Sequence, residues 1–160
     1  MALLGESESE FLSDKLVVVS SDFKRARETA EIMHQHFIVK APLRLEHGLR
    51  ERDFGELNMT DSSNYQKVWS QDAHNPNHTS FGCETVTNVL SRTSMLIKRL
   101  ESEYQDDGRI ILLVSHGDTL QITLTAYAGI APERHRSLEH LSNCDVRELT
   151  RQLTTAIAEQ

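Results

Sequence analysis

Residues 16–37, LVVVSSDFKRARETAEIMHQHF, predict a strand that leads directly into a helix. The run 16–19 is rich in β-branched side chains and too short for a helix, which is typical of a buried strand in a parallel sheet. Residues 20–22, Ser-Ser-Asp, supply side chains that cap helices, so we expect an amphipathic helix over residues 22–37 that packs on the strand. Its apolar positions recur at helical spacing and are Phe23, Ala26, Ala30, Met33 and Phe37.

The same order of elements recurs downstream. Residues 110–114, IILLV, predict a second buried strand, and a helix over about residues 118–128 follows it and ends at Gly129. A strand, a polar turn and a helix, used twice, predict an α/β fold with three layers, in which helices flank a mostly parallel sheet.

Between these two units the pattern is mixed. A long helical pattern begins after Gly82 and ends at a turn over residues 106–108, whereas residues 38–80 predict loops with one short helix around residues 65–69. We expect a single domain over residues 1–160, in which residues 1–14 are either a remnant first helix or an acidic tail.

The two turns that follow the strands carry side chains suited to an anion. In parallel sheets, ligands gather at the carboxyl ends of the strands, where helix N-termini present free backbone N–H groups. Arg25 lies in the first predicted turn of one helix, His116 directly follows the other strand, and Gly117 permits a close backbone approach. This arrangement predicts a phosphate pocket, although each residue alone also fits a surface arginine or a buried structural histidine.

Four segments, in order, resemble motifs of the histidine phosphatase superfamily, which includes the phosphoglycerate mutases. Residues 20–30, SSDFKRARETA, resemble the family's SSDLxRAxxTA, and residues 49–56, LRERDFGE, resemble its LxExxFGE. Residues 82–85, GCET, with Arg92 resemble the start of its GGES helix, and residues 114–117, VSHG, resemble its second His-Gly motif. The resemblance implies a phosphoglycerate mutase-like fold and chemistry on phosphomonoesters through a phosphohistidine.

The resemblance also assigns roles to individual residues. Arg25 would clamp the phosphate oxygens, Glu51 would act as the general acid that protonates the departing oxygen, and His116 would donate a hydrogen bond to the phosphoryl group. Gly117 would lie against the phosphate. Without the motif, the charged run 50–53 that contains Glu51 predicts only a solvated surface.

The family's nucleophilic histidine has no counterpart here. It belongs to an Arg-His-Gly motif on the family's first, central strand, and Arg-His-Gly occurs nowhere in these 160 residues. His47-Gly48 is preceded by glutamate and stands in the wrong place in the family's order. We therefore expect a truncated family member that lacks the first strand and has little or no turnover. The alternatives are a noncatalytic module that binds a phosphorylated ligand or another protein, and a chain without a stable fold.

Composition limits the partners and the compartment. Seventeen Lys and Arg against twenty-four Asp and Glu give a net charge of −7, which argues against nucleic acid and anionic membranes. The chain has no long apolar run, no basic leader and only two cysteines, so we expect a cytoplasmic protein. The expected partner is a phosphorylated small molecule or phosphopeptide, with self-association possible through the uncovered sheet edge. We expect no cofactor and no metal, because His34 and His36 cannot share one helix face and His74, His78 and Cys83 fall in a loop.

Overall fold

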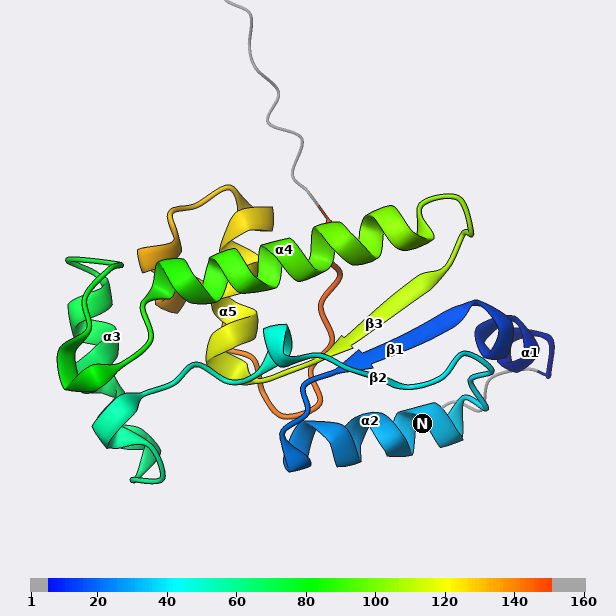
Figure 1. The fold of residues 1–160 in the computed structure, drawn as a ribbon, viewed down its shortest axis with the longest axis horizontal. Helices are drawn as coiled ribbons and strands as arrows, with labels where there is room; N and C mark the ends of the chain where they lie inside the picture. The colour runs from blue at the N-terminus through cyan, green and yellow to red at the C-terminus, as the bar shows by residue number, and fades with distance from the viewer. Residues whose placement is uncertain (1–5, 151–160) are drawn as a thin grey trace, which may run out of the picture. The chain divides into compact units, whose positions relative to one another are not determined.

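Strand β1 (Leu16–Ser20) lies at the centre of a three-stranded parallel sheet in the computed structural model, which describes residues 6–150. Strand β2 (Arg44–Leu45) pairs with one side of β1, and strand β3 (Ile110–Val114) pairs with the other. The register aligns Ser20 with both Leu45 and Val114, so the three strands end at the same edge of the sheet (Figure 1). The predicted α/β class and parallel sheet are confirmed.

The described chain forms two compact units. The first comprises residues 6–51 and 93–116 and contains the sheet. The second comprises residues 52–92 and 117–150 and is mainly helical. The expectation of one domain over residues 1–160 stays a prediction.

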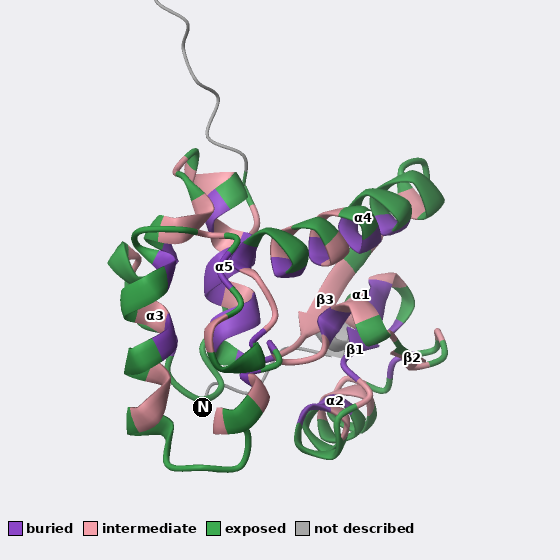
Figure 2. Ribbon diagram, turned by 60° about the vertical axis from the view of Figure 1, so that its left-hand side comes forward, coloured by how far each residue is buried: buried purple, intermediate pink, exposed green. Residues whose placement is uncertain are grey.

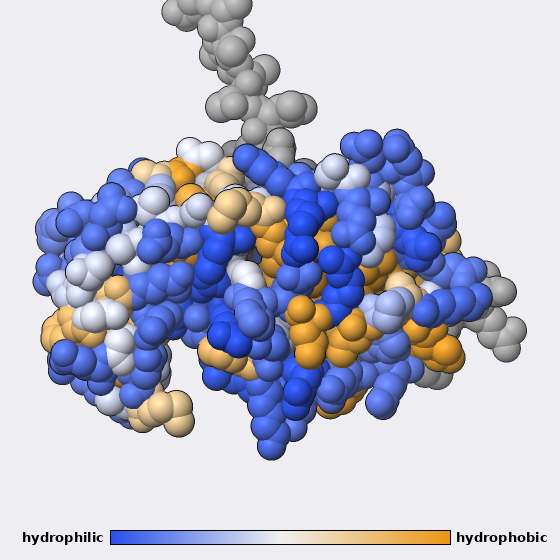
Figure 3. All heavy atoms as spheres, in the orientation of Figure 1, coloured by the Kyte–Doolittle hydropathy of each residue, from blue (hydrophilic) through white to orange (hydrophobic). Residues whose placement is uncertain are grey.

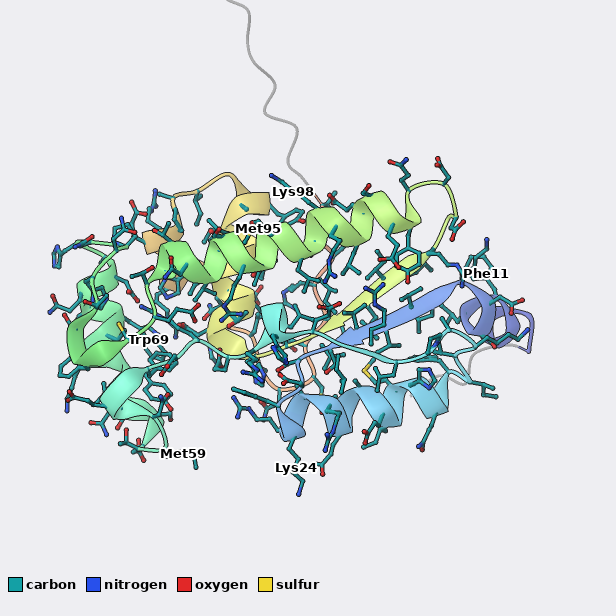
Figure 4. The ribbon with its side chains drawn as sticks, viewed as in Figure 1. Phe11, Lys24, Met59, Trp69, Met95 and Lys98 are labelled. Atoms are coloured by element: carbon teal, nitrogen blue, oxygen red, sulfur yellow. The ribbon has the colours of Figure 1, made fainter. Side chains whose placement is uncertain are left out.

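The first unit has three layers because the side chains of β1 alternate between two apolar clusters. Val17 and Val19 pack with Leu96 and Leu100 from the second half of α4 (Val86–Tyr104). The opposite face of β1 packs with Ala30 from α2 (Lys24–His36), which lies along the other side of the sheet (Figure 1). The outer face of α4 is hydrophilic apart from Met95, which Figure 4 shows pointing away from the sheet together with Lys98. The predicted three-layer packing is therefore present in this unit.

Two details of the predicted strand–helix packing were wrong. Helix α2 begins at Lys24, with an extended Phe23 as its N-cap residue and no side-chain cap, because the Ser21 hydroxyl instead accepts from the Phe23 N–H at 3.2 Å. Consequently Phe23 lies outside the core and is 36% exposed, whereas Ala26 and Ala30 are buried as expected. Met33 and Phe37 are only partly buried.

Strand β3 has the predicted bounds but not the predicted burial. All five residues of β1 are buried, whereas Ile110 is 43% exposed and the rest of β3 is half-buried. Figure 2 shows the contrast as a purple β1 and a pink β3. The physical reason is position, since β3 forms the outer strand of the sheet among residues 6–150. Self-association through this edge stays a prediction.

Helix α1 (Glu6–Lys15) precedes β1, so residues 6–14 are helical and the predicted acidic tail is wrong for them. Residues 1–5 lie outside the described residues. The helices expected downstream are present as α4, with Gly108 at φ +56° in the turn after it, and as α5 (Gly117–Ala128), with Gly129 at φ +65°.

The second unit is built from short helices around two apolar clusters. Helix α3 (Gln66–Asp72), with a 3₁₀ turn over Ser62–Tyr65, confirms the short helix expected in that region. Phe54, Val68 and Cys83 form one cluster, and the start of α4 packs with Ile122 of α5 in the other. Hydrophilic residues predominate on the face seen in Figure 3. Within the described residues, no helix combines the length and apolarity that a bilayer-spanning helix needs.

Candidate phosphate-binding site

The turn between β1 and α2 carries the first half of the site. The Ser21 N–H donates to the Val114 carbonyl at 2.9 Å, which joins the turn to the end of β3. The extended conformation of Phe23 then starts α2 one residue later, and Arg25 falls in the first turn of that helix. The start of α2 lies near the carboxyl edge of the sheet, where Figure 4 labels Lys24.

Arg25 and His116 meet at this edge although 91 residues separate them. The Arg25 Nε–H donates to His116 Nδ1 at 3.0 Å, and His116 Nε2 lies 2.9 Å from the Ser21 hydroxyl oxygen. A guanidinium nitrogen can only donate, so Nδ1 must accept and the neutral ring carries its proton on Nε2. The structure thus brings together the two residues that the sequence predicts for the anion site, with the imidazole 6% exposed.

Arg25 differs from its basic neighbours in having no acidic partner among the described residues. Its polar contact is the His116 ring, and its guanidinium carbon lies 5.6 Å from the centre of the Phe23 ring. Arg50, in contrast, donates twice to Asp22, at 2.7 and 2.5 Å. These hydrogen bonds to Arg50 lower the pKa of Asp22 from its usual value. Of these two guanidinium groups, that of Arg25 is the one without a carboxylate partner among residues 6–150.

His47 is also placed near this turn, but as a partner of Asp22. Its Nε2 atom lies 3.3 Å from the Asp22 carboxylate, and its side chain is 77% exposed. The expectation that His47 is not the nucleophile stays a prediction.

The segment that carries Glu51 is tied to the same end of the sheet. The Ser115 hydroxyl donates to the carbonyl of buried Leu49 at 2.7 Å. This hydrogen bond ties the segment that contains Glu51 to the residue that precedes His116. Glu51 itself is partly buried. Its acid role stays a prediction.

The solvated surface that run 50–53 suggests when taken without its motif does not describe Arg52, which is buried in the second unit. Its guanidinium donates to both Asp72 oxygens at 2.7 and 2.8 Å and contacts Asp118 at 3.4 Å, with no exposed side-chain surface. The Asp72 carboxylate also lies 2.7 Å from the His78 Nε2 atom, and the Cys83 sulfur lies 3.8 Å from an Arg52 guanidinium nitrogen. The alternating charges of residues 50–53 do not indicate that Arg52 is buried with Asp72 and Asp118.

His78 and Cys83 are therefore anchored in a core rather than lying in a free loop. Burial raises the pKa of the Cys83 thiol, with the Arg52 charge opposing it. No cluster of three or more metal-ligating side chains occurs within residues 6–150.

The remaining motif residues also lie in the second unit. Glu84 and Arg92 of the GCET segment pair at 2.9 Å. At Gly117 an added methyl group would meet no atom within 4 Å, so packing inside the chain does not require glycine there, and its predicted phosphate contact stays a prediction.

Sequence reasoning missed two residues of the site. Ser21, which contacts the His116 ring, was assigned to helix capping, and Phe23, whose ring lies edge-on to His116 with centroids 5.5 Å apart, was assigned to the core. The signal available was their position in the turn directly after the strand.

Comparisons with known proteins agree with this architecture. The family model for the histidine phosphatase superfamily (branch 1) matches residues 2–157. A solved structure titled mycobacterial hydrolase 2 superimposes with a TM-score of 0.68 at 23% identity, over 84% of this chain and 62% of that one. A mycobacterial glucosyl-3-phosphoglycerate phosphatase in complex with inorganic phosphate gives a TM-score of 0.67 at 21% identity, over 86% and 70% of the two chains.

A third likeness is the α-ribazole phosphatase from Shigella flexneri, with a TM-score of 0.62 at 23% identity, over 84% of this chain and 69% of that one. These identities establish a shared fold. The chain spans about three fifths to seven tenths of the length of these proteins. A search of curated proteins finds no match.

Proposed function

Because this chain belongs to the histidine phosphatase superfamily (branch 1), we propose that its Arg25–His116 site binds the phosphoryl group of a phosphomonoester. The observation that carries the proposal is the Arg25 guanidinium, which hydrogen-bonds a neutral imidazole and has no carboxylate partner among residues 6–150. In a chain with a net charge of −7, an anion needs such a local cation.

The residues at the site divide the work of holding a phosphoryl group. The flat guanidinium of Arg25 donates parallel hydrogen bonds to two phosphoryl oxygens, a geometry that lysine does not offer. The His116 Nε2–H moves from Ser21 to a third oxygen, which stabilises negative charge there. The resemblance assigns Glu51 to protonate the oxygen of a departing alcohol, a role that it can perform only when a nucleophile takes the phosphoryl group.

These 160 residues contain no Arg-His-Gly, and turnover should be correspondingly low. In other enzymes, removing the catalytic nucleophile lowers the turnover rate by a factor on the order of 10⁶. We propose that this chain binds phosphomonoesters and releases them largely unchanged, as an impaired phosphatase or phosphomutase.

A titration with inorganic phosphate tests the binding site. At one hundred times its dissociation constant, phosphate should raise the free energy of unfolding of the wild type by about 2.7 kcal/mol. The Arg25→Ala variant should lose this effect. Arg27→Ala is the matched control, because Arg27 lies on the same helix and pairs with Glu31 at its surface. Equal stabilisation of the Arg25→Ala variant would refute the site.

A turnover assay tests whether this chain hydrolyses phosphomonoesters. With an aryl phosphate as substrate, we expect hydrolysis close to background and no acid-labile, base-stable phosphoprotein. Robust hydrolysis that is lost in His116→Ala but kept in His47→Ala would mean that His116 or water performs the displacement, and the proposal of low turnover would then be wrong.

The second candidate function is a noncatalytic module that recognises a phosphorylated small molecule or peptide. The absence of Arg-His-Gly beside an intact pair of Arg25 and His116 favours it. Phosphate binding that depends on Arg25, with no turnover of any phosphomonoester, is the result that supports this candidate.

A further inference from the structure

Phe23 is an aromatic side chain that the fold does not use in its core. It belongs to neither apolar cluster of the first unit, and about a third of its surface is exposed. Its place is fixed by the backbone, since the extended Phe23 residue donates its N–H to Ser21 directly before α2 begins. The ring is therefore held at the carboxyl edge of the sheet rather than buried under the helix.

The ring lies beside both groups that would hold a phosphoryl group. Its centroid is 5.5 Å from that of the His116 ring, in an edge-on arrangement at 64°, and 5.6 Å from the Arg25 guanidinium carbon. A phosphoryl group bound by these two residues must project its ester oxygen and organic group out of the Arg25–His116 pair. The exposed part of Phe23 is an apolar surface next to this pair.

The other neighbour of the ring is a cation whose charge is already matched. The Arg50 guanidinium carbon lies 5.3 Å from the Phe23 centroid, and both of its hydrogen bonds to Asp22 are shorter than 3 Å. A second anionic group on the ligand would have to compete with the Asp22 carboxylate for Arg50. The surroundings of Phe23 thus favour an uncharged, flat organic group over a second phosphate.

We propose that Phe23 is the residue that determines specificity for the organic part of the ligand, and that the site prefers aryl phosphomonoesters to alkyl ones. This inference rests on the proposed binding of phosphate by Arg25 and His116. Contacts between aromatic rings typically strengthen binding by about two- to tenfold beyond the apolar area that they bury.

The test uses phosphonates, whose carbon–phosphorus bond is not hydrolysed, so that binding is measured without turnover. Dissociation constants for inorganic phosphate, methylphosphonate and phenylphosphonate are measured by calorimetry at a pH at which all three are dianions. The wild type should bind phenylphosphonate about three- to tenfold more tightly than methylphosphonate.

Three variants assign this preference to the ring. Phe23→Leu keeps an apolar side chain but removes the ring, and should reduce the preference for phenylphosphonate over methylphosphonate to less than twofold. Phe23→Tyr keeps the ring and should keep the preference. Phe11→Leu is the control, because Phe11 is 54% exposed and lies on α1 away from Lys24 at the start of α2 (Figure 4).

The outcomes separate the two proposals. If inorganic phosphate binds through Arg25 but Phe23→Leu retains the preference for phenylphosphonate, the role of Phe23 is refuted and the proposed function stands. If the wild type shows no preference, the inference is refuted as well. If inorganic phosphate does not bind the wild type, the proposed function fails, and the inference fails with it.

Discussion

Replacing Arg52 by methionine should destabilise the second unit strongly, because it leaves two buried carboxylates without their shared cation. Asp72 loses both hydrogen bonds from the guanidinium, Asp118 loses its contact at 3.4 Å, and the Glu84 carbonyl loses a donor at 2.8 Å. Removing one partner of a buried ion pair costs about 3–5 kcal/mol. The unsatisfied carbonyl adds about 1 kcal/mol.

We therefore expect Arg52→Met to lower the free energy of unfolding by about 4–6 kcal/mol, a large part of the 5–15 kcal/mol typical of a folded domain. At a urea dependence of about 2 kcal/mol per molar, the unfolding midpoint falls by about 2–3 M. The assay is tryptophan fluorescence in urea. Trp69 is the one tryptophan of the chain and packs against the Phe54 cluster, so its emission reports on the second unit.

Two controls test whether the loss of stability comes from the unpaired buried carboxylates. Arg27→Met removes a surface pair with Glu31 on another helix and should cost less than about 1 kcal/mol. Combining Arg52→Met with Asp72→Asn should cost at least 1 kcal/mol less than the sum of the two single changes, because the second change removes the stranded charge. A loss below about 1 kcal/mol for Arg52→Met alone would refute the reasoning, since a guanidinium that matters so little cannot be neutralising two buried carboxylates.

Three further predictions concern the same unit. Burial raises the pKa of the Cys83 thiol, whereas Cys144 is exposed. At pH near 8 a thiol reagent should therefore modify Cys144 and reach Cys83 only in urea, which mass spectrometry of the digested protein would reveal. Equal rates of modification at the two cysteines would contradict this. Gly55→Ala should cost more than the roughly 1–2 kcal/mol of its left-handed backbone, because the new methyl carbon would overlap the Phe81 carbonyl oxygen. Gly129→Ala would meet no atom within 4 Å, so in urea melts it should cost only the backbone contribution. Burial alone would raise the pKa of Asp118, but its basic neighbours hold that pKa below its usual value. The ionised carboxylate therefore stabilises the fold above about pH 3.9, and this contribution is lost as the pH falls through the lower pKa of the folded state. Asp118→Asn should make the free energy of unfolding fall less steeply with decreasing pH, and an unchanged pH dependence would contradict this.

The fold and part of the site follow from local sequence patterns. The β-branched run at residues 16–19 and the apolar run at 110–114 specify strands, and the helices after them have close to their predicted bounds. Arg25 and His116 could be named as site residues because each follows a strand end, and parallel strands place such ends at one edge.

Other features depended on contacts between residues far apart in the chain. The burial of Arg52 requires Asp72 and Asp118, which are 20 and 66 residues away, and a charged run gives no sign that such partners exist. The position of Phe23 beside the site likewise requires His116, 93 residues further along the chain, whose ring centroid lies 5.5 Å from that of Phe23.

By itself, the sequence determined the order of strands and helices and indicated the side chains that we propose for an anion site, because periodicity and strand ends are properties of neighbouring residues. Only the tertiary structure decided which strand is central and which is at the edge, which guanidinium is matched by a carboxylate, and which aromatic ring borders the site. Burial and charge pairing are set by whatever the folded chain brings within a few ångströms, and sequence distance does not encode that proximity.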